Sequence, residues 1–278
     1  MTTDKNKKII LITGSRKGIG YNLSIYYLGQ GHIVIGCSRS ETELNHENYK
    51  HYCLDVSNEK EVNDLFVMIR KQYGRLDILI NNAGMASMNH TLLTPLSTVK
   101  KLFDTNFTGT FLFSRQACKL MKKNNFGRII NFSSVAVPLN LEGESIYSAT
   151  KSAIEQFTKV FSKEISTMGI TINTIGPTPI ETDLIKAVPK NKIDDLLAHQ
   201  TIKRFGNFND SISHDHSTQR ITINSKLTCI SNTRFNIKLF RRAEIHCTSI
   251  HALIIGRVVV LTKENWINTL FCEHSRSF

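Results

Sequence analysis

An apolar run near the N-terminus leads directly into a glycine-rich turn, and this combination restricts the folds open to the chain. Residues 8–13 are mostly apolar and β-branched, which is typical of a strand buried in a parallel sheet. Gly14, Gly18 and Gly20 follow, and residues 21–28 have helical character. An ordinary tight turn needs only one glycine, whereas three let the backbone approach a phosphate at a helix N-terminus. We therefore expect a strand–turn–helix unit that binds a pyrophosphate, with the spacing G-x-x-x-G-x-G.

Apolar strands alternate with helical segments along the next part of the chain. This alternation predicts the α/β class, with a Rossmann-type doubly wound parallel sheet formed by a single domain over residues 1–210. A short helix is expected between the second and third strands, and a long one over residues 99–121. The further strands are expected at residues 33–37, 52–56, 77–80, 128–132 and 170–175.

Tyr147 and Lys151 are four residues apart, and Ser134 lies upstream of them. Residues at this spacing share one face of a helix, so a phenol and an ammonium group become neighbours. A phenol normally titrates near pH ~10, and an adjacent cation favours its ionised form. The spacing therefore indicates a proton donor that works near neutral pH, although a half-buried Tyr beside a solvated Lys is a common alternative.

These motifs occur together with others in a specific order. The chain resembles the short-chain dehydrogenase/reductase family and is most similar to its 3-oxoacyl-acyl-carrier-protein reductase type. The resemblance covers roughly residues 7–210. The motifs that carry it are Thr13-Gly14-x-x-x-Gly18-Ile19-Gly20, Asp55-Val56, Asn81-Asn82-Ala83-Gly84, Asn106, Ser134, Tyr147-x-x-x-Lys151 and Pro177-x-x-Ile180-x-Thr182.

The resemblance implies an NADPH-dependent oxidoreductase that reduces a ketone to a secondary alcohol by hydride transfer, with a 3-oxoacyl thioester as one candidate substrate. It implies that Tyr147 is the general acid and that Ser134 donates to the same carbonyl oxygen. Lys151 would lower the pKa of Tyr147 and bind the nicotinamide ribose. Asn106 would hold a water that links Lys151 to solvent.

The resemblance also implies a set of cofactor-binding residues. The glycine loop would hold the phosphates, Asp55 and Val56 would contact the adenine, and Ile180 and Thr182 would hold the nicotinamide carboxamide. Asn81 is expected to tie neighbouring strands together instead, and Thr178 replaces the family's usual glycine. The full set is Gly14, Ser15, Arg16, Lys17, Gly18, Ile19, Gly20, Arg39, Asp55, Val56, Asn82, Ala83, Gly84, Tyr147, Lys151, Ile180 and Thr182.

The end of the second strand favours NADP(H) over NAD. An enzyme that uses NAD needs an acidic residue there to hold the ribose 2′-hydroxyl, whereas a 2′-phosphate needs cations. The chain has Cys37-Ser38-Arg39 at this point, with no carboxylate, and Arg16 and Lys17 lie in the glycine loop. We therefore expect Arg39 to face the 2′-phosphate.

Composition excludes several other classes. No run approaches the ~20 apolar residues of a membrane span. The six cysteines form no C-x-x-C pair, so we expect reduced thiols in a cytoplasmic protein. The net charge is +12, but the basic residues are scattered, which favours a phosphorylated cofactor or an acidic carrier over nucleic acid. His214-Asp215-His216 has no further ligands at set spacing, so no metal site is expected.

Two segments after residue 180 raise separate questions. Residues 181–201 are expected to form a lid over the substrate, with an apolar lining of Leu184, Ile185, Val188, Leu196 and Leu197. From Ser211 onward the chain has one glycine and no proline, and it no longer matches the family. Residues 211–278 are either a frameshifted or disordered tail, or a divergent extension in which Val258–Leu261 forms the seventh strand. The first case would leave an unstable or non-catalytic cofactor-binding remnant, and the second a homo-oligomer, dimeric or tetrameric.

Overall fold

Strand β1 (Ile9–Thr13) is completely buried and lies within a seven-stranded sheet. The structure is a computed structural model that describes residues 7–177, 179–182, 188, 190–198, 203–206 and 228–230. The strand order is β3-β2-β1-β4-β5-β6-β7, and the first six strands are parallel. The further strands are β2 (Ile33–Ser38), β3 (Tyr49–Cys53), β4 (Ile78–Asn81), β5 (Gly127–Phe132), β6 (Ile170–Gly176) and β7 (Thr228–Ile230).

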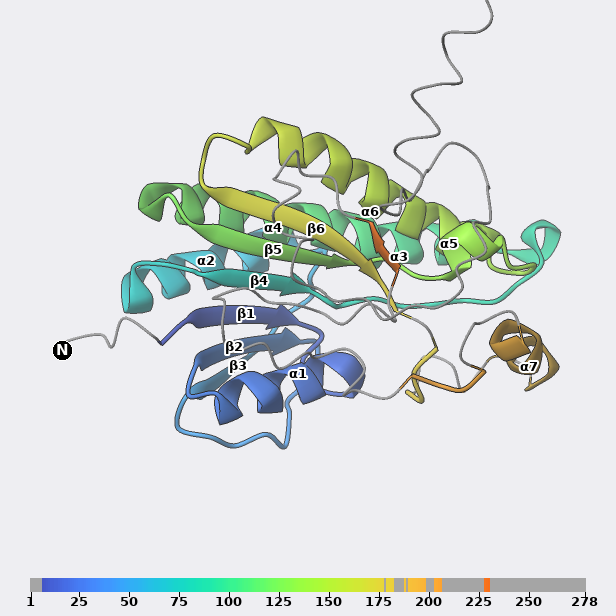
Figure 1. The fold of residues 1–278 in the computed structure, drawn as a ribbon, viewed down its shortest axis with the longest axis horizontal. Helices are drawn as coiled ribbons and strands as arrows, with labels where there is room; N and C mark the ends of the chain where they lie inside the picture. Colours follow the sequence, from blue (N-terminus) through green and yellow to red (C-terminus); the bar gives the residue numbers. More distant parts are fainter. Residues whose placement is uncertain are drawn as a thin grey trace, which may run out of the picture. The chain divides into compact units, whose positions relative to one another are not determined.

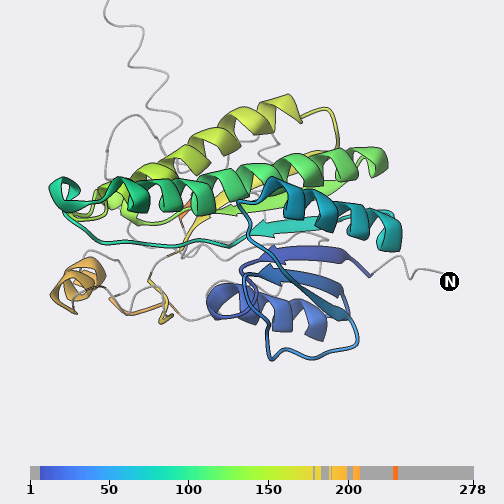
Figure 2. The same cartoon turned by 180° about the vertical axis from the view of Figure 1, so that it is seen from behind.

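Helices cover both faces of this sheet (Figure 1). Helix α1 (Gly18–Gly29) packs on one face, while α2 (Glu59–Tyr73), α4 (Gly109–Met121) and α6 (Ser145–Glu164) pack on the other, as Figure 2 shows from behind. The predicted Rossmann-type doubly wound sheet is therefore confirmed. The shorter helical segments are η1 (Thr91–Leu93), α3 (Leu96–Leu102), η2 (Phe103–Thr108), η3 (Lys122–Asn124), α5 (Ala136–Leu139) and α7 (Lys190–Ala198).

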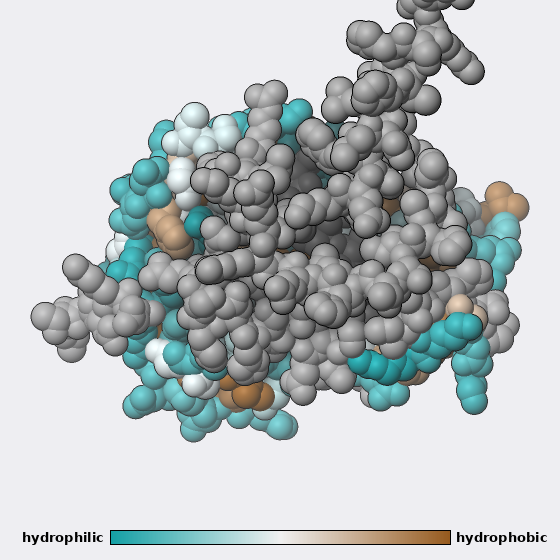
Figure 3. All heavy atoms as spheres, in the orientation of Figure 1, coloured by the Kyte–Doolittle hydropathy of each residue, from teal (hydrophilic) through white to brown (hydrophobic). Residues whose placement is uncertain are grey.

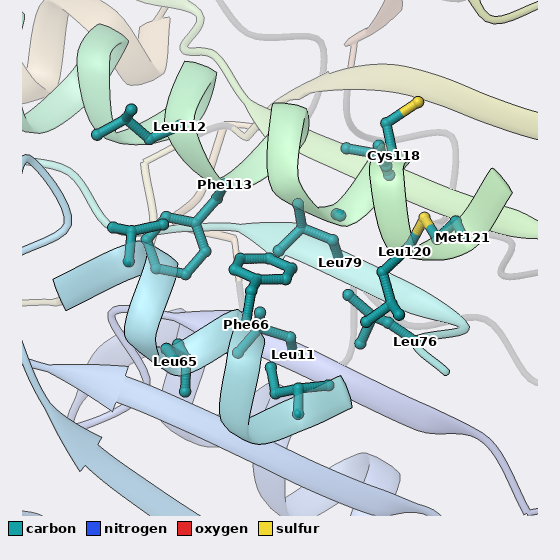
Figure 4. Close-up of a cluster of buried hydrophobic side chains, with 14 of the residues drawn as sticks. Leu11, Leu65, Phe66, Leu76, Leu79, Leu112, Phe113, Cys118, Leu120 and Met121 are labelled. Atoms are coloured by element: carbon teal, nitrogen blue, oxygen red, sulfur yellow. The ribbon is translucent and has the colours of Figure 1, made fainter. Parts of the chain in front are cut away.

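The larger apolar core lies between the sheet and the layer formed by α2 and α4 (Figure 4). Phe66 of α2 and Phe113 of α4 meet edge to face, with their ring centroids 5.8 Å apart. Leu11 and Leu79 reach the same cluster from β1 and β4, and both are fully buried. Because its strands are sandwiched between helices, this sheet needs the continuous apolar runs that the sequence shows.

Two local predictions are wrong. No helix connects β2 to β3: residues 39–48 form an irregular connection whose only apolar side chain is Leu44, so a helix there would have no apolar stripe to bury. Strand β3 ends at Cys53, and residues 54–56 lie beyond it. The predicted long helix is present, but its middle turn, η2, is π-helical.

The seventh described strand, β7, lies in a segment for which no strand was predicted. Thr228–Ile230 pairs antiparallel with β6, with Gly176 opposite Thr228 and Thr174 opposite Ile230. The alternative strand at Val258–Leu261 lies outside the described residues, as do Thr178, Leu184, Ile185 and the segment His214–His216. The assignment of residues 211–278 as an atypical tail therefore stays a prediction.

The surface of the described residues is mixed. Hydrophilic side chains predominate among the coloured residues visible in Figure 3, with a few hydrophobic ones between them. The most exposed large apolar side chains are Leu92, Leu93 and Leu96, which are 87%, 79% and 67% exposed. Among the described helices, none is both long enough and apolar enough to cross a membrane.

Candidate active site

The predicted site residues follow the carboxyl ends of neighbouring parallel strands. Gly14 follows β1, Asn82 follows β4 and Ser134 lies just after β5. The strand order reverses between β1 and β4, because β2 and β3 lie on one side of β1 while β4 and β5 lie on the other. Open α/β sheets bind ligands at such a switch point, outside the carboxyl ends of the strands.

The glycine loop requires its glycines for two different reasons. Gly14 and Gly18 have φ values of +68° and +62°, which side chains rarely adopt. Gly20 has no room for a side chain, because an added Cβ would collide with the carbonyl oxygen of Gly14. The Asn82 side-chain amide fixes the start of the loop by donating to the carbonyls of Thr13 (2.9 Å) and Gly14 (3.1 Å).

Helix α1 begins at this loop with a bare N-terminus. Its N-cap residue, Lys17, makes no capping hydrogen bond through its side chain, and no acidic residue lies in the first turn. The first N–H groups of a helix have no intrahelical partner and carry a partial positive charge. The loop and helix start therefore fit the phosphates of a dinucleotide, and Gly14 and Gly20 let the loop pack closely against Ala83 and Asn82.

Ser134, Tyr147 and Lys151 come together at the end of β5. Tyr147 and Lys151 lie on α6 and are only 6% and 4% exposed. The Lys151 Nζ lies 5.8 Å from the Tyr147 ring centroid and donates to the Phe132 carbonyl at 2.9 Å. Ser134 forms a side-chain hydrogen bond with Tyr147. The alternative of a half-buried Tyr beside a solvated Lys is therefore wrong, because both side chains are enclosed.

Burial controls the protonation of this pair, which corrects the prediction from spacing. Burial raises the pKa of Tyr147 to about 12, and the Ser134 hydrogen bond only partly opposes this rise. Burial also lowers the pKa of Lys151 to about 8. We expected Lys151 to lower the pKa of Tyr147, but burial of the phenol is the largest effect on it, and the charge of Glu144 raises this pKa further. Tyr147 therefore keeps its proton throughout the neutral range.

Asn106 lies in the π-helical turn η2 and is fully buried. Its side chain accepts from the Met85 N–H at 2.8 Å and donates to the Met85 carbonyl and the Thr150 hydroxyl, both at 3.0 Å. A Cβ added to Gly84 would lie 3.4 Å from both the Asn106 Oδ1 and the Lys151 Nζ. The π-helical turn, a feature often found at functional sites, thus brings Asn106 to the segment that also borders Lys151.

The other predicted cofactor residues surround the loop in different ways. Arg16 and Lys17 are exposed, and Ile19 is partly buried in the first turn of α1. Thr182 lies beside Gly18, with its Cγ2 3.5 Å from a Cβ built there. Ile180 is buried and forms an isolated parallel bridge with Gly206.

The residues after β3 and β4 have clear contacts of their own. Burial raises the pKa of Asp55, but hydrogen bonds from Ser57 and the charge of Arg39 outweigh it, so the net change is downward. Val56 is buried and packs against Gly109 of α4. Ala83 donates its N–H to the Thr13 hydroxyl at 2.9 Å. The placement of Arg39 near Asp55 puts a cation close to the end of β2.

Asn81 has the structural role expected of it. Its side-chain amide donates to the Asn131 Oδ1 at 2.8 Å and to the Ser114 hydroxyl at 2.9 Å, which ties β4 to β5 and α4. The neighbouring Ser133 donates to the buried Glu155 at 2.6 Å, so it connects β5 to α6. Among the described residues, no group of three His, Cys, Asp or Glu side chains could hold a metal ion.

Ser15 contacts two residues of β3, Tyr49 and His51, that the sequence analysis did not identify. It is fully buried, and its hydroxyl lies 3.1 Å from the Tyr49 hydroxyl and 3.5 Å from the His51 Nδ1. The role predicted for Ser15 at the cofactor stays a prediction. The only sequence signal for Tyr49 and His51 is their i, i+2 spacing, which puts both on one face of β3.

Comparison with known proteins agrees with this geometry. A family profile described as short chain dehydrogenase matches residues 8–193. The chain therefore belongs to the short-chain dehydrogenase/reductase family, and it is an oxidoreductase of the class that interconverts alcohols and carbonyl compounds.

The chain is also similar in sequence to individual members of the family. It is 32% identical over 205 residues to the 3-oxoacyl-acyl-carrier-protein reductase of Vibrio cholerae, which covers 72% of this chain and 84% of that one. It is 33% identical over 199 residues to an uncharacterized oxidoreductase of Bacillus subtilis, covering 68% and 76%.

Solved structures with nicotinamide cofactors bound are also similar to this protein. The structure of ElxO with NADP bound matches with a TM-score of 0.67 and 32% identity, covering 73% of this chain and 88% of that one. A short-chain dehydrogenase from Leptospira borgpetersenii with bound NAD⁺ also has a TM-score of 0.67, at 26% identity, covering 74% and 82%. These two structures share the fold but hold different nicotinamide cofactors.

Proposed function

We propose that the chain is an NADPH-dependent reductase that converts a ketone to a secondary alcohol. The observation that carries this proposal is the grouping of the half-buried Ser134 with the buried Tyr147 and Lys151, in a chain whose helix α1 has an uncapped N-terminus. The bound nicotinamide would supply the hydride that reaches the carbonyl carbon. Side chains of this protein would stabilise the carbonyl oxygen and supply the proton.

Those side chains act on the carbonyl oxygen. Ser134 donates a hydrogen bond to it and stabilises the negative charge that develops as the carbon is reduced. Tyr147 gives its phenolic proton to the same oxygen, which completes the alcohol. Burial keeps that proton on Tyr147 until it is needed, since it raises the pKa to about 12.

Lys151 and Asn106 support the proton transfer. With a pKa of about 8, Lys151 is mostly protonated at neutral pH, and its charge stabilises the phenolate that forms when Tyr147 loses its proton. Asn106 fixes the backbone at Met85 and borders the same space as the Lys151 ammonium. We infer that a water beside Asn106 returns the proton from solvent to Tyr147 through Lys151.

The choice of NADPH over NADH rests on charge at the end of β2. The described residues that follow β2 include Arg39 and offer no carboxylate before Glu41. Arg16 and Lys17 add two cations in the glycine loop. A 2′-phosphate is recognised by such cations, and the NADP-bound ElxO is among the similar structures. The NAD⁺-bound Leptospira structure has the same fold, so these residues, and not the fold, favour NADPH.

A 3-oxoacyl thioester is the substrate that the surroundings favour. The Thr91 hydroxyl lies 2.7 Å from the Ser145 hydroxyl at the start of α6, which places the exposed Leu92 and Leu93 near the helix that bears Tyr147. Apolar surface there suits an acyl chain, and a net charge of +12 suits an acidic carrier protein. Small ketones are the second substrate class.

We also infer a cytoplasmic homo-oligomer. Cys37, Cys53 and Cys118 are free thiols, as expected of a reducing compartment. On α6, Phe157 and Phe161 stack with ring centroids 5.2 Å apart, and Val160 between them is 47% exposed. This apolar helix face suits contact with a second copy, and light scattering would reveal the dimer or tetramer.

Cofactor absorbance tests the proposal. Purified protein would be mixed with NADPH or NADH and with 3-oxoacyl thioesters, small ketones, sugars and steroids. We expect faster consumption of NADPH than of NADH, and turnover of at least one ketone class. Consumption of neither cofactor by a folded protein would contradict the proposal.

The composition of residues 211–278 supports a second candidate, a non-catalytic remnant that still binds cofactor. Thermal melting with and without NADPH separates the two, because a ligand that binds only the native state raises the melting temperature. A non-cooperative melt that NADPH does not change would favour the remnant. Limited proteolysis would show whether residues from 211 onward are trimmed first, as expected of a frameshifted tail, and resequencing the DNA near codon 210 would test the reading frame.

A further inference from the structure

Four polar side chains form a continuous hydrogen-bonded chain between the glycine loop and the end of β2. We propose that this chain, Ser15–Tyr49–His51–Ser38, orients Arg39 and so sets the preference for a 2′-phosphorylated cofactor. We call it the β3 relay. The proposal rests on the proposed function, and it concerns the adenosine end of the cofactor rather than the reacting end.

The first link of the β3 relay lies in the protein interior. The Ser15 hydroxyl, which is fully buried, lies 3.1 Å from the Tyr49 hydroxyl. Gly36 of β2 makes this contact possible, because an added Cβ there would collide with the Tyr49 hydroxyl and the Ser15 Oγ. Burial raises the pKa of Tyr49 to about 12, so its hydroxyl remains a donor at neutral pH.

The second link runs from Tyr49 to His51. The Tyr49 hydroxyl lies 2.8 Å from the His51 Nδ1, and both rings project from the same face of β3. The other ring nitrogen, Nε2, lies 3.1 Å from the Ser40 carbonyl oxygen, which can only accept. Nε2 therefore carries the proton in neutral His51, and Nδ1 accepts from Tyr49.

The third link fixes the segment that carries Arg39. The His51 Nε2 lies 3.0 Å from the Ser38 hydroxyl, and that hydroxyl donates to the Ser40 carbonyl at 2.6 Å. Residues on both sides of Arg39 are thus held by one imidazole, although Arg39 itself is exposed. At the other end, the N–H groups of Gly14 and Ser15 donate to the Cys37 carbonyl at 2.8 and 3.2 Å.

The arrangement has a consequence for specificity. The cofactor's ribose is expected at the end of β2 in this fold, and a 2′-phosphate there needs a cation that is already in place. An exposed arginine loses side-chain and backbone freedom when it binds, and a segment that is already fixed loses less. NAD⁺ has no phosphate at this position, so its affinity should not depend on the β3 relay.

Binding measurements test the proposal without relying on turnover. We would measure the affinity of NADP⁺, NAD⁺ and 2′,5′-ADP by calorimetry for the wild type, for His51→Leu and for the milder Tyr49→Phe. Tyr52→Phe is the matched control, because it removes a hydroxyl from the same strand but from the opposite face. Melting temperatures would be recorded for every variant.

The β3 relay predicts a selective loss. His51→Leu should weaken NADP⁺ and 2′,5′-ADP by about tenfold and Tyr49→Phe by about threefold, as expected when hydrogen bonds that orient a cation are removed. NAD⁺ affinity should stay unchanged in both variants, and Tyr52→Phe should resemble the wild type. Equal weakening of NADP⁺ and NAD⁺, or no change in Tyr49→Phe when it is folded, would overturn the proposal.

These outcomes are separate from those of the proposed function. A wild type that binds NADP⁺ tightly but reduces no ketone would contradict the reductase assignment and leave the β3 relay open to the same binding test. A wild type that reduces ketones with NADPH but shows no selective loss in His51→Leu would overturn the β3 relay alone. A wild type that prefers NAD⁺ would overturn both.

Discussion

Helices α1 and α2 both follow a strand end, yet their N-termini are built in opposite ways. The side chain of Asn58 caps α2, accepting from the N–H groups of Lys60 (3.1 Å) and Glu61 (3.3 Å), and acidic residues occupy its first turn. Helix α1 has a lysine as N-cap, no capping side chain and no acid in its first turn. The capped end of α2 satisfies its own N–H groups, while α1 leaves its N–H groups available to an anion.

Helix α6 also carries a group whose position in the site lowers the stability of the fold. Lys151 is a cation buried within the protein, where its pKa falls to about 8, so charging it in the folded state is unfavourable. A folded pKa below the unfolded value means that the unfolded chain binds more protons between pH ~8 and ~10.5, so stability rises with pH across that window.

The largest expected effect on stability comes from removing this charge. Lys151→Met should be more stable than the wild type below pH ~8, by up to about 3 kcal/mol, and the advantage should shrink as the pH rises to ~10. Urea unfolding of both proteins across this range would measure the difference. Equal stability at every pH would show that the ammonium is adequately solvated or paired in the folded protein.

The next effect concerns the glycine loop. Gly20→Ala should weaken NADPH binding about 100-fold, because the new Cβ forces the Gly14 carbonyl out of the loop. Gly29→Ala is the control, since a Cβ at the other end of α1 meets nothing within 4 Å. Calorimetric titration compares the two variants. Similar affinities would mean that the loop tolerates side chains and does not cradle a phosphate.

Giving α1 the kind of N-terminus that α2 has should produce a smaller change. Lys17→Asp would add a capping side chain and a negative charge, so NADPH affinity should fall about tenfold while the helix gains stability. The melting temperature without cofactor should rise. Tighter NADPH binding in this variant would contradict the placement of the phosphates at α1.

The smallest expected effect is at α2 itself. Asn58→Ala should lower the free energy of unfolding by about 1 kcal/mol, the usual value of an N-cap, and should leave NADPH affinity unchanged. Thermal melting and titration would measure the two quantities. A matching loss of cofactor affinity would mean that the N-terminus of α2 also belongs to the site.

The contrast between the helices explains what could be predicted from sequence. The sheet and the glycine loop could be predicted from the apolar runs at β1, β4 and β5 and from the three glycines. Buried strands require apolar residues, and backbone conformations that side chains rarely adopt require glycine. The bare start of α1 was also readable, since no Ser, Thr, Asp or Asn stands at residue 17.

Other features depend on contacts between distant parts of the chain, and the sequence indicates them only weakly. The spacing of Tyr147 and Lys151 shows that they are neighbours on a helix but not that both are buried, so it does not predict that the pKa of Tyr147 rises. The connection between β2 and β3 is long enough for a short helix, but residues 39–48 carry no apolar stripe, so the expected helix is absent. Tyr49 and His51 were missed because their hydrogen bonds depend on Gly36 in a neighbouring strand.

The central claim is that Tyr147 gives its proton to the carbonyl oxygen as the carbon receives hydride. Tyr147→Phe keeps the ring and removes only the hydroxyl, so NADPH affinity and melting temperature should match the wild type. The rate of NADPH consumption with the best ketone should fall by about 1000-fold, while Tyr52→Phe should retain full activity. If Tyr147→Phe binds NADPH normally and still reduces the ketone at the wild-type rate, the account of the site is wrong.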